Sequence, residues 1–164
     1  MSVAKVTACD VPEGSLLAEF GGPEDYTDCF YRDVPGEVTL PEFIERFYRS
    51  TAFLPERLVL RAIGSNASPA DARAVARGEA ERFGVWRVVE RRETQALLES
   101  KSTNTASWFA VEALGEGTRP SSSSEAVGQT RLYFGSWVGN LDQSGWRSML
   151  RAHVWYSRWL LGGV

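Results

Sequence analysis

Apolar residues recur at helical spacing near the C-terminus, from Leu141 to Leu161. At about 100° per residue, one broad stripe collects most of the apolar side chains together with the single histidine of the chain: Trp146, Met149, Leu150, His153, Tyr156, Ser157, Leu160 and Leu161. Nearly opposite this stripe lie Ala152, Trp155 and Trp159. The pattern predicts one long helix that carries His153 on its core-facing side.

The residues before this helix change to a period of two, which is typical of β-strands. Alternation, with many β-branched and aromatic residues, predicts five strands: Tyr26–Val34, Val85–Arg92, Thr94–Lys101, Thr105–Leu114 and Thr130–Val138. Because short turns join the last four, we expect them to be antiparallel neighbours.

Two or three helices are predicted between the first two strands. Thr39 and Glu42 have the spacing of a capping box, and Pro55 suits the first turn of a second helix. Ser68-Pro69 with Asp71 begins a third, whose apolar side extends past Gly78 to Phe83. Gly78 costs this helix about 1 kcal/mol relative to alanine.

The order of elements predicts an α+β fold with a helix-grip plan, in which a curved antiparallel sheet wraps around the long C-terminal helix. Twenty helical residues span about 30 Å, enough to cross a five-stranded sheet. A chain of 164 residues suits one domain. We expect an irregular N-terminal arm over residues 1–24 and a single helix-grip domain over residues 25–164.

Several segments resemble a bacterial family of unknown function in the START and birch-pollen-allergen superfamily of helix-grip proteins. They are Asp25-Tyr26-Thr27-Asp28 through Gly64, Thr130-Arg131-Leu132-Tyr133-Phe134, Gly145-Trp146-Arg147 and Tyr156-Ser157-Arg158. The chain has Asn104-Thr105-Ala106 where that family tends to show His-Leu-Asp, and Trp155-Tyr156-Ser157-Arg158 where it tends to show Pro-Phe-His-Arg. The resemblance implies a central cavity, in a superfamily whose members bind lipids, hydrophobic metabolites or polyketides and include some cyclases.

The first functional hypothesis is a small hydrophobic or amphipathic ligand held between the sheet and the last helix. The expected lining combines apolar side chains with a few polar ones that orient the ligand: Phe109, Val111, Leu132, Phe134, Met149, His153 and Ser157. For His153, three roles stay open, namely a hydrogen-bonded core histidine, a polar anchor for the ligand or a catalytic base. No cofactor is expected.

Two further hypotheses use other features. An enzyme of the cyclase, dehydratase or isomerase kind would use His153 as base and Tyr133 or Tyr156 as proton donor. A ligand-free interaction module would instead use a second apolar face of the sheet, because Trp108, Tyr133 and Trp137 stand where a one-sided sheet would be polar. That face is covered by N-terminal segments or loops, carries surface aromatic residues that are simply tolerated, or forms a homodimer contact through these three residues.

Composition excludes several classes of function. The net charge is −3 and the basic residues are scattered, so we expect no nucleic-acid partner. One histidine and two distant cysteines argue against a metal site. No apolar run approaches the length of a membrane span, and the first twenty residues lack a signal-peptide pattern. With Cys9 and Cys29 as the only cysteines, a reducing, cytoplasmic location is expected, although a bridge between them stays open.

Overall fold

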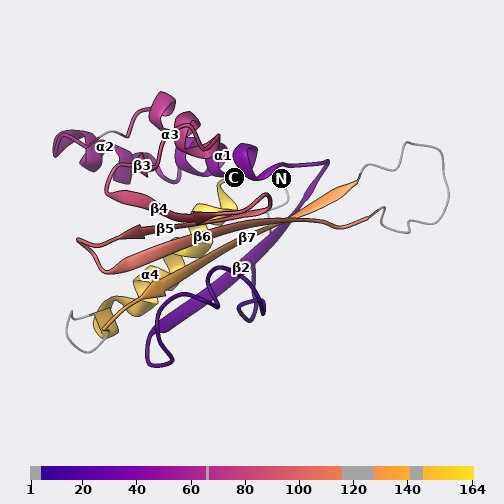
Figure 1. Cartoon of the computed structure of the whole chain (residues 1–164), viewed down its shortest axis with the longest axis horizontal. Coiled ribbons are helices and arrows are strands. Elements are labelled where there is room, and N and C mark those ends of the chain that lie inside the picture. Colours follow the sequence, from indigo (N-terminus) through magenta and orange to yellow (C-terminus); the bar gives the residue numbers. More distant parts are fainter. Residues whose placement is uncertain (1–4, 66, 116–127, 141–145) are drawn as a thin grey trace.

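The computed structural model describes residues 5–65, 67–115, 128–140 and 146–164. They form an α+β fold in which one curved, seven-stranded antiparallel sheet is accompanied by four helices (Figure 1). The strand order is β1-β2-β7-β6-β5-β4-β3. The strands are β1 (Thr7–Ala8), β2 (Tyr26–Pro35), β3 (Arg82–Phe83), β4 (Trp86–Arg91), β5 (Gln95–Ser100), β6 (Thr105–Ala113) and β7 (Gln129–Val138). The helices are α1 (Leu40–Arg49), α2 (Leu54–Ala62), α3 (Pro69–Ala76) and α4 (Trp146–Gly162).

The helix starts follow the predicted capping signals. Thr39 caps α1 and Ser68 caps α3, each in a complete capping box, and both helices have proline in the first turn. The predicted extension of α3 to Phe83 is wrong. The helix ends at Ala76 because Gly78 adopts φ +75°, a left-handed conformation that glycine takes without strain and that ends a helix.

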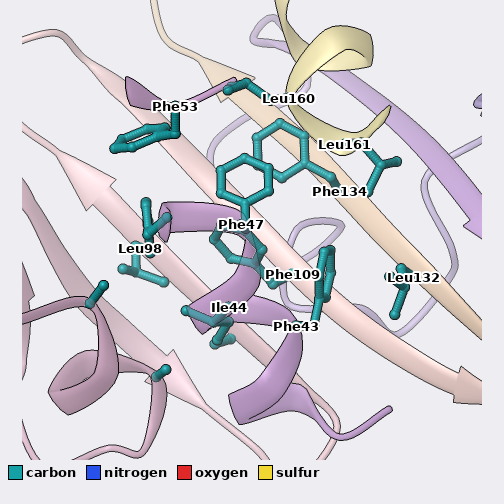
Figure 2. Close-up of a cluster of buried hydrophobic side chains, with 14 of the residues drawn as sticks. Phe43, Ile44, Phe47, Phe53, Leu98, Phe109, Leu132, Phe134, Leu160 and Leu161 are labelled. Atoms are coloured by element: carbon teal, nitrogen blue, oxygen red, sulfur yellow. The ribbon is translucent and has the colours of Figure 1, made fainter. Parts of the chain in front are cut away.

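Helices α1 and α4 lie on the same face of the sheet, and in Figure 1 helices α1 to α3 are grouped toward one edge of it. Helix α1 packs against β6, and α4 packs against β2 and β7. Under α1 the interior is a cluster of aromatic side chains (Figure 2). The ring centroid of Phe47 lies 4.9 Å from that of Phe109 and 4.7 Å from that of Phe134. The ring centroids of Phe43 and Phe109 are 5.6 Å apart.

The opposite face of the sheet is covered by the N-terminal arm, which is therefore part of the packed structure. Leu16 and Leu17 are buried together with Trp108, which is only 2% exposed. Gly135 on β7 makes the close approach possible, because a Cβ there would stand 2.5 Å from Leu17 Cδ2. Of these explanations for the second apolar face, the structure supports coverage by an N-terminal segment.

The proposed homodimer contact needs correction for the same reason. Trp108 lies beneath the arm and donates its Nε1–H to Gln95, so it is not available to a partner. Trp137 is half-buried against Phe20 and donates to Asp25. Tyr133 is half-buried and donates to Glu112. Dimerisation itself stays a prediction, which size-exclusion chromatography with light scattering tests.

Helix α4 is held against the sheet by its C-terminal end. Arg32 on β2 donates to the carbonyl oxygens of Gly162 and Val164 at 3.0 and 2.8 Å, which would otherwise lack helical partners. As predicted, Leu160 and Leu161 are buried, while Trp155 on the far side is 64% exposed. The predicted start of this helix, residues 141–145, lies outside the described residues.

Candidate functional site

A cavity of about 350 Å³ lies between the helices and the inner face of β6 and β7. Residues from α1, α2 and α4 complete its walls. Met149 lines it and is 57% exposed, so the cavity opens to solvent near the start of α4. The lining comprises Phe47, Tyr48, Phe53, Glu56, Trp86, Thr103, Thr105, Ala106, Ser107, Phe134, Ser136, Met149, Ala152, His153, Tyr156, Ser157 and Leu160.

The strand register explains why the interior is hollow at this level. Phe30, Phe134 and Phe109 are direct neighbours across β2, β7 and β6 and form a row of large rings. Two residues along each strand, on the same face, the register brings together Asp28, Ser136 and Ser107. These side chains are smaller and polar, so they leave space at their level of the sheet, whereas the large rings of the first row fill the interior at theirs.

Asp28 and His153 meet at one wall of this space. His153 Nε2 lies 3.6 Å from Asp28 Oδ2, and the two side chains are 17% and 9% exposed. Tyr26 donates its hydroxyl to Asp28 Oδ2 at 3.0 Å, and the backbone N–H of Ser136 donates to Asp28 Oδ1 at 3.1 Å. The carboxyl group is thus fixed by its own sheet, and the imidazole is brought to it by α4.

The Arg32 contact sets the position of His153 along the sheet. Asp28 and Arg32 are four strand residues apart, which is about 13 Å at 3.3 Å per residue. His153 and Leu161 are eight helical residues apart, which is about 12 Å at 1.5 Å per residue. Because the two lengths match, holding the end of α4 at Arg32 places His153 opposite Asp28.

Burial controls the charge of this pair. It lowers the pKa of His153, an effect that the nearby Asp28 carboxylate partly opposes. Burial also raises the pKa of Asp28, against the influence of His153 and of the hydrogen bonds from Tyr26 and Ser136. Both shifts favour neutral side chains. A neutral imidazole can accept a proton or a hydrogen bond from a ligand in the cavity.

A second polar pair, Glu56 and Tyr156, lines the same cavity. Tyr156 on α4 donates its hydroxyl to Glu56 Oε2 on α2 at 2.6 Å. Burial raises the pKa of Glu56, although the hydrogen bond from Tyr156 lowers it in part. Burial and the contact with Glu56 also raise the pKa of Tyr156. The pair joins α2 to α4 and places a carboxyl group at the cavity wall.

Of the seven predicted lining residues, the structure brings four to the cavity: Phe134, Met149, His153 and Ser157. Phe109 and Leu132 are fully buried in the solid core, and Val111 packs against that core, so these three do not line it. Above Phe109 the space is occupied by α1, whose Phe43 and Phe47 rings pack against it. Sequence periodicity identified the correct face of the strands but not the half of that face that α1 covers.

Sequence reasoning missed Asp28 and Glu56, which supply the acidic groups of the site. Asp28 had a detectable signal, since it is an inward-facing charge among the apolar positions Phe30 and Val34 of the same strand face. Glu56 had none, because a glutamate in the first turn of a helix is common for its favourable interaction with the helix dipole. Its role depends on the distant Tyr156.

The proton-donor candidates separate clearly. Tyr156 and His153 line the same cavity. Tyr133 has its hydroxyl on Glu112, and its ring packs with Trp108 on the face that the N-terminal arm covers. Of the two candidates, only Tyr156 faces the space that His153 faces.

Cys9 and Cys29 are free thiols on the covered face, with sulfur atoms 3.4 Å apart.

Comparison with protein families, curated proteins and solved structures returns no match to this chain. Within the described residues, no group of three or more His, Cys, Asp and Glu side chains is placed to hold a metal ion. None of the helices in the described ranges is both long enough and apolar enough to span a membrane.

Proposed function

We propose that this chain binds a small hydrophobic or amphipathic molecule in the cavity between the sheet and α4. The observation that carries the proposal is the cavity itself, about 350 Å³ in volume, with aromatic walls and a few convergent polar groups. Ligand sites of small-molecule binders have this size and composition. The Asp28–His153 and Glu56–Tyr156 pairs would orient the polar part of the ligand.

We further propose that the chain is a helix-grip protein of the START and birch-pollen-allergen superfamily. The curved antiparallel sheet and the C-terminal helix across it support this assignment. So does the resemblance of the segments around Tyr26, Thr130 and Tyr156. Helix α4 shares its face of the sheet with α1, which confines the cavity to one half of that face.

Native mass spectrometry of freshly purified protein tests the binding proposal first, since a co-purifying small molecule would add a discrete mass to the chain. Ala152→Phe then blocks the cavity from an exposed helix position that lines it. Arg151→Phe, at the neighbouring exposed position outside the lining, is the matched control. Loss of the bound mass in Ala152→Phe alone supports the site; equal retention in both variants contradicts it.

An acid–base enzyme is the second candidate function, favoured by the position of His153 and Tyr156 on one cavity. A neutral His153 would take a proton from a carbon next to a carbonyl group. The Tyr156 hydroxyl, on turning away from Glu56, would donate to the carbonyl oxygen. Asp28 would act as a positioning residue, because its carboxyl group lies next to the imidazole.

Hydrogen–deuterium exchange at the α-carbons of 2-tetralone, an apolar enolisable ketone, tests this chemistry without a known substrate. The wild-type chain in deuterated buffer would accelerate loss of the α-proton signals over buffer alone. His153→Gln would abolish the acceleration and Arg151→Gln, outside the lining, would keep it. Equal rates with wild type and His153→Gln would remove His153 as a base.

A further inference from the structure

The charges around the cavity are not balanced. Among the lining residues that the structure describes, Glu56 is the one carboxylate, and Asp28 lies directly behind His153. The described lining contains no lysine or arginine. An ionised Glu56 would therefore meet no cation in the described wall of the cavity, and a ligand would have to supply one.

The Glu56 carboxyl group can carry a charge, can accept further hydrogen bonds and lies beside an aromatic side chain. It lies in the first turn of α2, where the helix dipole stabilises a negative charge. It accepts one hydrogen bond, from the Tyr156 hydroxyl to Oε2, and a carboxylate has capacity for several more. Glu56 lies next to Tyr48, where its charge adds to burial in raising the pKa of the tyrosine.

Aromatic rings form the wall next to this carboxyl group. The ring centroids of Tyr48 and Phe53 are 5.1 Å apart, and Trp86 lies 6.4 and 6.0 Å from them. All three rings and that of Tyr156 line the cavity. The faces of such rings carry negative electrostatic potential and attract ammonium groups, most strongly where water is excluded.

We propose that the ligand is an amphipathic amine, whose ammonium group binds between Glu56 and the rings of Tyr48, Phe53 and Trp86. The hydrocarbon part then extends over Phe134 and Leu160, which line the same cavity. This inference rests on the proposed binding function and specifies its ligand class. A carboxylic acid would be repelled at Glu56, and a neutral alcohol would gain a hydrogen bond there but no charge interaction.

The test compares 4-phenylbutylamine, 4-phenylbutan-1-ol and 5-phenylpentanoate, which share a phenyl ring on a chain of four methylene groups and differ only in the end group. Isothermal titration at pH 8 measures each dissociation constant on the wild-type chain. The amine should bind about tenfold or more tightly than the alcohol, the size of a partly desolvated cation–π and ion-pair contact. The carboxylate should bind most weakly.

Glu56→Gln should remove the preference for the amine and leave the affinity for the alcohol within about twofold of wild type. Glu37→Gln removes the same charge at an exposed position outside the cavity and should leave all three affinities unchanged. The wild-type comparison stands even where a variant folds poorly.

The outcomes distinguish a failure of the amine assignment from a failure of the proposed binding function. Equal binding of the three probes, or tightest binding of the carboxylate, overturns the amine assignment and leaves the binding function standing. Binding of none of the probes, with no small molecule retained in native mass spectrometry, overturns the binding function and the amine assignment with it.

Discussion

The two halves of the helix-covered face of the sheet are built from the same strands but have opposite interiors. Under α1, Phe109 and Leu132 belong to a solid core with no exposed surface. Under α4, Ser107 and Ser136 on the same strand faces border a cavity. The difference shows that a change from large apolar to small polar side chains, at one level of the register, is enough to turn solid core into a cavity.

The largest expected effect comes from a substitution in the solid half. Phe109→Ala should lower the free energy of unfolding by about 3–5 kcal/mol, because the ring is buried among Phe43, Phe47 and Phe134 and would leave a void. Ser107→Ala, two residues away in the hollow half, should change it by no more than about 0.5 kcal/mol. Urea denaturation measures both, and similar losses would mean that the two halves are equally packed.

Asp28 tests how far the hollow half depends on its polar network. Asp28→Ala leaves the Ser136 N–H and the Tyr26 hydroxyl without their acceptor and should cost about 1–3 kcal/mol in urea denaturation. Asp28→Asn keeps an oxygen in place and should cost clearly less. Equal losses in the two variants would contradict a role for these hydrogen bonds.

At neutral pH the buried carboxyl group of Glu56 should lower the free energy of unfolding. Burial raises the pKa of Glu56 in the folded chain, so the folded state holds the proton more tightly than the unfolded state. Stability therefore falls as pH rises from the unfolded pKa through the folded one. Glu56→Gln, which resembles the protonated form, should raise the midpoint of thermal unfolding at pH 8, and this gain should largely vanish at pH 4.

The exposed Glu37→Gln provides the control for this comparison. It should leave the midpoint nearly unchanged at both pH values. A decrease at pH 8 in Glu56→Gln would contradict the inferred cost of burying this carboxyl group.

The smallest predicted effect is a shift in the pKa of His153, which is measured separately from global stability. His153 is the single histidine, so its ring signals in NMR are assigned without ambiguity. Its pKa should lie below 6.5 because burial disfavours the charged ring. Asp28→Asn should lower the pKa further, since it removes the carboxylate that favours the imidazolium. A titration above 6.5, or a rise in the variant, would contradict the buried environment of this half.

Much of the fold was predictable because its signals are local. The capping boxes at Thr39 and Ser68 act within one helical turn, and the alternation in β6 and β7 is visible within each strand. Gly78 was misjudged as a tolerated helix interior, because its left-handed conformation belongs to the turn that leads into β3.

By itself, the sequence predicted five of the seven strands in their order with the helices, the inward face of β6 and β7, and the side of α4 that carries His153. The tertiary structure alone decided that Asp28 meets His153, that Glu56 meets Tyr156, and that α1 fills one half of the interior while the other stays open. The physical reason is the distance along the sequence over which each interaction acts. Periodicity and capping depend on neighbours within a few residues, whereas these pairs are separated by 100 residues or more and meet only through strand register and the anchoring of α4 at Arg32.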